Sequence, residues 1–159
     1  MKEKYDEQVK KAVEEVARFL KFRPRTKKEV RDKLLLKGYP EEVISLSISF
    51  LEENNILNDE KFAREWFKER LSLKKIGLKK VKLELKRKGI DNEIIEKVAS
   101  EFSNSENETA NALEFLNLKF MKVGDKKSLS KEKLIPLLLR RGFSYDVASE
   151  ATKEFLKDK

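Results

Sequence analysis

The chain has 159 residues, of which 42% are charged and 39% hydrophobic, and its net charge of +8 favours a polyanionic partner. It contains no run of the roughly 20 apolar residues that a membrane span needs and no apolar leader behind Met1, which predicts a cytoplasmic protein. The absence of His and Cys excludes the usual zinc ligands, a thiol nucleophile and an imidazole base.

The predicted elements form a repeat built around three glycines. Gly38, Gly89 and Gly142 lie 51 and 53 residues apart, and each follows aliphatic residues four and eight positions earlier. This spacing places the aliphatic side chains on one face of a helix that ends just before the glycine. Glycine suits that position because it adopts the left-handed conformation after a helix at the least cost. The aliphatic pairs are Val30 and Leu34, Val81 and Leu85, and Leu134 and Leu138.

Each unit contains one helix before this glycine-terminated helix and one after it. Thr26 and Ser130 lie twelve residues before their glycines, where a side-chain oxygen can cap the start of the second helix. The third helices are expected to start near Pro40, Asp91 and Ser144, two positions after each glycine. The first helices are expected at about residues 6–21, 58–73 and 106–121.

Residues 44–50 also fit another structure, because their apolar residues alternate with a period of two, as in a half-buried strand. The equivalent residues 94–99 have helical spacing, and we therefore predict a helix in both places. The sequence as a whole predicts an all-α fold of three tandem three-helix repeats that resemble helix-turn-helix motifs. Such repeats stack into an elongated, curved array. The predicted units are residues 1–57, 58–105 and 106–159.

Charge alternates in step with the repeat. Residues 18–37 carry nine basic and two acidic side chains, whereas residues 38–60 carry six acidic side chains and no basic one. Residues 74–88 again carry eight basic side chains against a single Glu. The helix dipole favours cations only at carboxyl ends, so cations at the starts of second helices indicate a binding surface rather than a solvated face. The predicted basic stripe consists of Arg23, Arg25, Lys27, Lys28, Arg31, Lys74, Lys75, Lys79, Lys80, Lys82, Lys86, Arg87, Lys126, Lys127, Lys131 and Arg140.

Motifs for catalysis or for a cofactor are absent from the sequence. It lacks both the phosphate loop Gly-x-x-x-x-Gly-Lys-Ser/Thr and the dinucleotide motif Gly-x-Gly-x-x-Gly. The adjacent carboxylates at residues 41–42 fit a solvated helix face better than an acid–base pair. Trp66 and most Phe residues are expected in the core, and only Phe22, between Lys21 and Arg23, loosely fits a base-stacking aromatic. We therefore predict a binding protein that is not an enzyme and that has no metal and no cofactor.

Residues 7–102 resemble a known family, and the last third of the chain resembles it only in its helix pattern and its Arg141-Gly142-Phe143 turn. The residues that carry the resemblance are Thr26-Lys27-Lys28-Glu29-Val30 with Lys37-Gly38-Tyr39, Leu57-Asn58-Asp59-Glu60-Lys61-Phe62-Ala63-Arg64, and Lys88-Gly89-Ile90. This arrangement is similar to that of the RecX family, small bacterial modulators of the RecA recombinase.

The resemblance implies a function in protein binding. Members of that family lodge in the groove of the RecA filament on DNA and limit its ATP hydrolysis, strand exchange and coprotease activity. It implies a monomer that binds the RecA filament and binds single- or double-stranded DNA weakly. Two alternatives remain open. A direct DNA-binding helical protein would bind DNA tightly, with an affinity that falls steeply with salt. A non-catalytic helical adaptor would use its basic stripe only for solubility.

Overall fold

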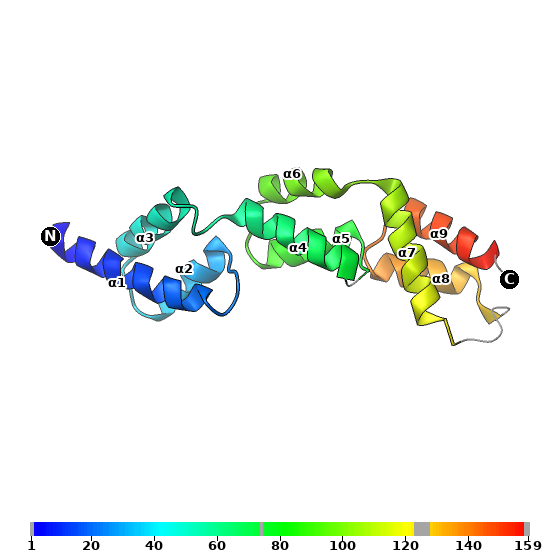
Figure 1. Cartoon of the computed structure of the whole chain (residues 1–159), viewed down its shortest axis with the longest axis horizontal. Helices are drawn as coiled ribbons and strands as arrows, with labels where there is room; N and C mark the ends of the chain where they lie inside the picture. Colours follow the sequence, from blue (N-terminus) through cyan, green and yellow to red (C-terminus); the bar gives the residue numbers. More distant parts are fainter. Residues whose placement is uncertain (1, 74, 123–127, 158–159) are drawn as a thin grey trace.

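The computed structural model describes residues 2–73, 75–122 and 128–157, and the regular structure of these ranges is helical. The helices follow one another along an elongated molecule whose two ends are the first and last helices (Figure 1). The helices are α1 (Lys2–Leu20), α2 (Lys27–Leu36), α3 (Glu41–Glu53), α4 (Asp59–Leu73), α5 (Leu78–Arg87), α6 (Asn92–Phe102), α7 (Ser105–Lys119), α8 (Lys131–Arg140) and α9 (Tyr145–Lys157).

Each group of three consecutive helices encloses a core of its own. We call α1–α3 unit 1, α4–α6 unit 2 and α7–α9 unit 3. The helix pairs that pack extensively, such as α1 with α3 and α7 with α9, belong to the same unit. The prediction of an all-helical fold of tandem three-helix repeats is therefore confirmed. Fully buried residues at the three centres include Val16, Leu34 and Leu51, then Phe67, Leu85 and Val98, then Leu116, Leu138 and Phe155.

The three glycine turns have the conformation that their sequence pattern predicts. Gly38, Gly89 and Gly142 have φ angles of +88°, +86° and +97°. In the first turn the Tyr39 amide donates to the Leu34 carbonyl at 3.2 Å, and the same bond closes the other two turns. This is the hydrogen-bonding pattern that ends a helix when a left-handed residue follows it. The backbone conformation at these positions therefore favours glycine over any residue with a side chain.

The predicted helix starts differ in whether a side chain caps them. Thr26 caps α2 in full, because its hydroxyl accepts from the Glu29 amide and the Glu29 carboxylate accepts from the Thr26 amide. Ser144 accepts from the Val147 amide at 3.3 Å. Ser130 precedes α8 as expected, but its side chain makes no capping hydrogen bond, so that part of the prediction is wrong.

The ambiguous segment at residues 44–50 is helical, as we predicted, and lies within α3. Ile44, Ser47 and Ile48 face the core, whereas Leu46 and Phe50 are exposed. The apparent alternation arises because a serine occupies a buried position. Its hydroxyl donates to the Val43 carbonyl at 2.7 Å, which satisfies the polar group inside the core.

The second helices of the three units abut end to end. At the junction of units 1 and 2, the Thr26 hydroxyl donates to the Lys88 carbonyl at 2.9 Å. At the junction of units 2 and 3, the Gly77 amide donates to the Arg141 carbonyl at 2.9 Å, and the Lys79 amide donates to the Gly142 carbonyl at 3.1 Å. Carbonyls at the end of one helix thus accept from the residues that begin the next, through a side-chain hydroxyl at the first junction and through backbone amides at the second.

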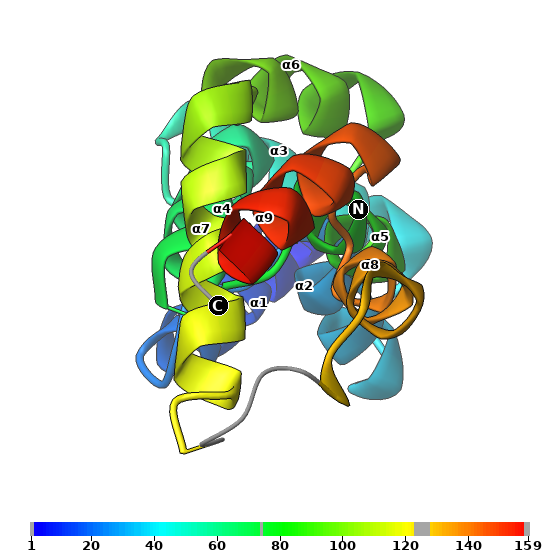
Figure 2. The ribbon, with the colours of Figure 1, turned by 90° about the vertical axis from the view of Figure 1, so that its right-hand side faces the viewer.

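Viewed along the long axis, α8, α5 and α2 therefore lie one behind another (Figure 2). This row of second helices is what brings basic segments from three units to one side of the molecule. Within the ranges described above, every helix falls short of the length and apolar character needed to span a bilayer.

Candidate partner-binding surface

The outer side of α5 carries the least compensated positive charge of the predicted stripe. Lys79, Lys86 and Arg87 are exposed, and Lys80 is half-buried beside unit 3. Lys80, Lys86 and Arg87 lie one, seven and eight residues after Lys79. This spacing places all four on the side of the helix opposite the buried Val81–Leu85 pair. Among the residues that the structure describes, these four cations form no ion pair with any acidic side chain. We call Lys79, Lys80, Lys86 and Arg87 the α5 basic face.

The predicted cations of unit 1 are placed differently, because each has a carboxylate beside it. Such exposed pairs add little to stability, but they reduce the positive potential at the surface. Unit 1 therefore contributes less net charge to the stripe than its composition suggests. Arg23 and Arg25 pair with Glu29, Lys27 with Glu52, Lys28 with Asp32, and Arg31 with Glu41.

Two predicted stripe residues are largely structural. The Arg25 side chain is only 15% exposed, and its guanidinium lies 3.9 Å from the centre of the Phe19 ring. The Lys75 side chain is 19% exposed and pairs with Glu114 of α7 at 2.9 Å. Both cations thus connect neighbouring elements and offer little surface to a partner.

The remaining predicted stripe residues differ in whether their charge is paired and in whether the structure describes them. Lys82 pairs with Glu96 of α6 at 3.1 Å, so part of its charge is compensated within unit 2. Lys131 and Arg140 are exposed on α8 and form no ion pair within the described part of the chain. Lys74, Lys126 and Lys127 lie outside the described residues. The stripe therefore centres on α5 and continues onto α8.

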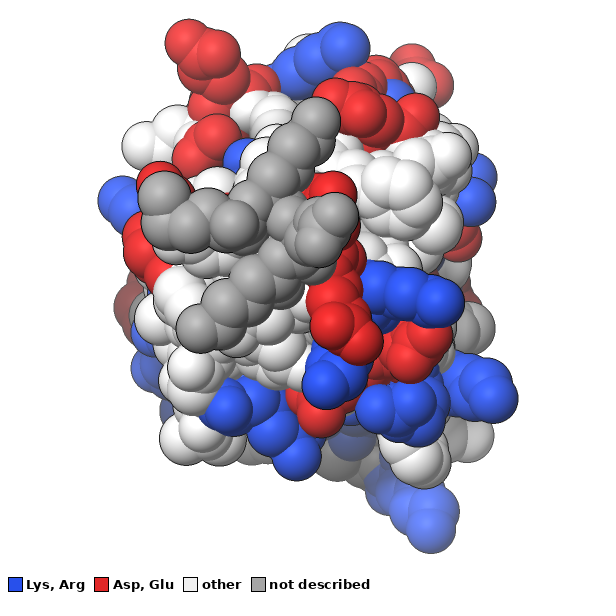
Figure 3. All heavy atoms as spheres, turned by 90° about the vertical axis from the view of Figure 1, so that its left-hand side faces the viewer, with Lys and Arg blue, Asp and Glu red and all other residues white. Residues whose placement is uncertain are grey.

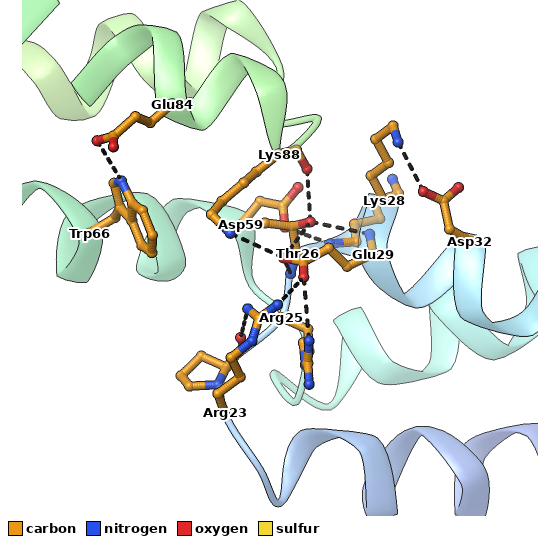
Figure 4. Close-up of polar contacts among 12 residues, drawn as sticks. Arg23, Arg25, Thr26, Lys28, Glu29, Asp32, Asp59, Trp66, Glu84 and Lys88 are labelled. Atoms are coloured by element: carbon orange, nitrogen blue, oxygen red, sulfur yellow. Dashed lines mark hydrogen bonds and ion pairs between the residues drawn. The ribbon is translucent and has the colours of Figure 1, made fainter. Parts of the chain in front are cut away.

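A polar cluster joins units 1 and 2 (Figure 4). Around the Thr26–Lys88 hydrogen bond, the Lys27 amide donates to Asp59 Oδ1 at 2.9 Å. Burial opposes ionisation of Glu29, but the Thr26 amide, the Lys88 ammonium and the Arg23 guanidinium together outweigh it and hold the Glu29 pKa below its ordinary value. Burial raises the pKa of Asp59, although the Lys27 amide and ammonium act in the opposite direction. The cluster ties the start of α2 to both α4 and the end of α5.

The aromatic residue Trp66 also belongs to the scaffold. Its indole N–H donates to Glu84 Oε1 at 3.3 Å, and the Arg70 guanidinium binds both oxygens of Glu84 at 3.0 and 2.6 Å. The Lys88 ammonium lies 4.7 Å from the centre of the Trp66 ring. These contacts engage the half-buried indole with side chains of its own unit, so Trp66 packs against the core, as predicted, without being fully buried in it.

Sequence reasoning missed the apolar residues that accompany the cations on the second helices. Leu36, Leu83 and Leu139 are exposed on α2, α5 and α8, respectively. A usable signal existed, because all three fall outside the spacing of the buried aliphatic pairs. The pairing of Thr26 with Lys88 had no such signal, since 62 residues separate the two.

The chain matches two family models and several known proteins. Residues 12–51 match the model of the first three-helix domain of RecX, and residues 58–98 match that of the second. The regulatory protein RecX of Clostridium perfringens strain SM101 is 40% identical over 132 residues, which cover 81% of this chain and 61% of that protein. The protein of the same name from Amycolatopsis mediterranei is 30% identical over 154 residues, which cover 96% of this chain and 87% of the relative.

A crystal structure of RecX from Lactobacillus salivarius superposes with a TM-score of 0.83 at 26% sequence identity. The match covers 96% of this chain and 99% of that one. The chain spans about three fifths of the length of its Clostridium perfringens relatives.

Proposed function

This chain belongs to the RecX family, and on that premise we propose that it regulates homologous recombination and DNA repair by binding the RecA filament on DNA. In this proposal the bound protein inhibits the ATPase, strand-exchange and coprotease activities of the filament. No catalytic step is assigned to the chain, since its relatives are named regulatory proteins. We further propose a cytoplasmic monomer whose units divide at residues 57/58 and 105/106, between the three core clusters.

The observation that supports this proposal is the α5 basic face on a row of aligned second helices. A filament is itself a repeating lattice, so an elongated chain can make several weak contacts with it at once. Contacts from tethered modules add up, provided that their spacing suits the lattice. Pairs of charges near a protein surface attract by a few kcal/mol at most and are screened by salt, so the contact is expected to weaken as salt rises.

The test compares two variants of equal charge change in a RecA ATPase assay on single-stranded DNA. In one variant Lys79, Lys80, Lys86 and Arg87 are replaced by Glu; Lys82 is left unchanged because it pairs with Glu96. The matched control replaces four exposed lysines elsewhere by Glu: Lys10, Lys11, Lys68 and Lys119.

We expect the α5 variant to need at least about tenfold more protein for the same inhibition, whereas the control inhibits like the unmodified chain. Far-UV circular dichroism should show equal helicity in all three proteins. Equal inhibition by the two variants would refute the role of the α5 basic face. Tight binding of bare DNA by the unmodified chain, with no effect on the ATPase, would favour the direct DNA-binding function instead.

A further inference from the structure

A second cluster of cations surrounds an exposed aromatic ring in unit 1, away from the α5 basic face. Phe22 follows α1 and is 84% exposed, although burying a phenylalanine side chain is generally worth about 1.5–3 kcal/mol. It lines a hollow of about 220 Å³ between α1 and α2. The other residues of the lining are Glu15, Arg18, Phe19, Lys33 and Lys37.

The charge around this ring is positive and mostly uncompensated. Among the described residues, Arg18, Lys21, Lys33 and Lys37 form no ion pair with an acidic side chain. Arg23 pairs with Glu29 but keeps a side chain that is 46% exposed. Seen from the end of the molecule that carries unit 1, Lys and Arg side chains gather along the lower part of the surface, with Asp and Glu above them and across the middle (Figure 3).

The acidic residue in the lining is Glu15, and one of its carboxylate oxygens is buried without a hydrogen-bond partner among the described residues. Lys33 in the last turn of α2 and the C-cap residue Lys37 lie one turn apart, so both ammonium groups can approach one side of the hollow. The Lys33 ammonium lies 5.2 Å from the centre of the Phe19 ring. The hollow is thus lined by two aromatic rings, three cations and one carboxylate.

An exposed ring among cations matches the chemistry of unpaired nucleotides. Single-stranded nucleic acids bind where aromatic side chains stack on bases and cations follow the phosphates. A duplex offers its phosphates but keeps its base faces stacked inside, so it would use the cations without the ring. The hollow is smaller than typical small-molecule pockets, which have roughly 300 Å³ or more. Its size suits the ring of one nucleotide base.

We propose that Phe22 and its surrounding cations form a binding site for single-stranded nucleic acid, distinct from the α5 basic face. Phe22 stacks on one unpaired base. The phosphates on either side of that base contact Arg18 and Lys21 on one side of the ring and Lys33 and Lys37 on the other. The site does not depend on the proposed contact with a recombinase filament, because it needs no second protein.

The experiment measures the binding of a fluorescently labelled 15-nucleotide oligo-dT to the full chain by anisotropy at low salt. Phe22→Ala should weaken binding roughly 5- to 150-fold, the range for removal of one base-stacking aromatic. Leu36→Ala is the matched control, because Leu36 is 85% exposed and apolar but has no π-face. We expect this control to bind like the unmodified chain.

A second variant reports stacking directly. Phe22→Trp should retain binding, and the oligonucleotide should quench its fluorescence, whereas Trp66 of the unmodified chain should be quenched far less because it is engaged within unit 2. A duplex of the same length should bind the unmodified chain more weakly than oligo-dT and should be insensitive to Phe22→Ala.

Three results would overturn the proposal. The first is equal oligo-dT affinity of the Phe22→Ala and Leu36→Ala variants. The second is displacement of oligo-dT by poly-glutamate together with insensitivity to Phe22→Ala, which would assign the cations to an acidic protein. The third is loss of oligo-dT binding in the α5 variant alone. Loss of RecA inhibition in the α5 variant with intact oligo-dT binding would leave this site standing, so the two proposals fail separately.

Discussion

Three glycines allow backbone strain and close packing between units to be separated by single alanine substitutions. Gly38 has a φ of +88°, and among the described residues no atom lies within 4 Å of where its Cβ would be. Gly77 has an ordinary φ of −85°, but a Cβ atom there would overlap the Gly142 backbone. Gly142 has a φ of +97°, and a Cβ atom added to it would lie 2.7 Å from the Lys80 amide nitrogen. Because that nitrogen belongs to the backbone, it cannot move aside as a flexible side chain would.

The expected losses follow from these differences. Gly38→Ala adds about 1–2 kcal/mol of left-handed strain, partly offset by the lower entropy of the unfolded chain, for a net loss of about 1 kcal/mol. Gly77→Ala adds no strain but forces the junction apart. It thereby breaks the two hydrogen bonds from the Gly77 and Lys79 amides, worth about 2 kcal/mol together. Gly142→Ala combines both effects, for about 3 kcal/mol.

Urea denaturation followed by circular dichroism measures the total loss, and amide hydrogen exchange locates it. The Lys79 amide is the reporter, because it donates across the junction to the Gly142 carbonyl at 3.1 Å. Its exchange should accelerate roughly 30-fold in Gly77→Ala and at least as much in Gly142→Ala, and should not change in Gly38→Ala. Equal stability losses in all three variants, with Lys79 equally protected, would refute the claim that the glycines hold the units in close contact.

Three further predictions concern side chains of units 1 and 2. The lowered pKa of Glu29 means that its ionised form stabilises the fold above about pH 4.5 and that this contribution is lost as the pH falls through the folded-state pKa. Glu29→Gln should therefore flatten the acidic limb of a pH–stability curve, and an unchanged limb would contradict this. Thr26→Val removes a helix cap and the hydrogen bond to Lys88, and should lower the free energy of unfolding by about 2 kcal/mol in urea denaturation. Thr26→Ser keeps the hydroxyl and should lower it much less. Equal losses in the two variants would show that the hydroxyl is unimportant. Arg70→Lys replaces the guanidinium that binds both oxygens of Glu84 and should lower the free energy of unfolding by about 1 kcal/mol, as followed by thermal melting. A melting temperature equal to that of the unmodified chain would show that the two hydrogen bonds are not needed.

Local features of the chain were predictable because they depend on neighbours in sequence. The turns at Gly38, Gly89 and Gly142 follow from the position of glycine after an aliphatic helix face, and all three have positive φ angles. The Thr26 cap was predicted from the position of Thr26 twelve residues before Gly38, and it is present in full. Ser130 occupies the same position without a capping bond, since the residue type alone does not set the side-chain rotamer.

The candidate binding surface was predictable only in part. The concentration of cations on α5 was visible in the sequence, and the structure leaves Lys79, Lys86 and Arg87 exposed. The burial of Arg25 against Phe19 was not visible, because it depends on how α1 crosses α2. Pairings such as Lys82 with Glu96 depend in the same way on which side of a helix faces the next one.

The sequence by itself determined the helices, their order and the three-fold repeat, because apolar spacing and glycine position act over a few residues along one chain segment. Only the tertiary structure decided that the second helices join end to end, through the bonds of Thr26 to Lys88 and of Gly77 to Arg141. Those contacts connect residues more than sixty positions apart. The same packing decided which cations are neutralised and which remain available, because an ion pair depends on distance in space and not on distance along the chain.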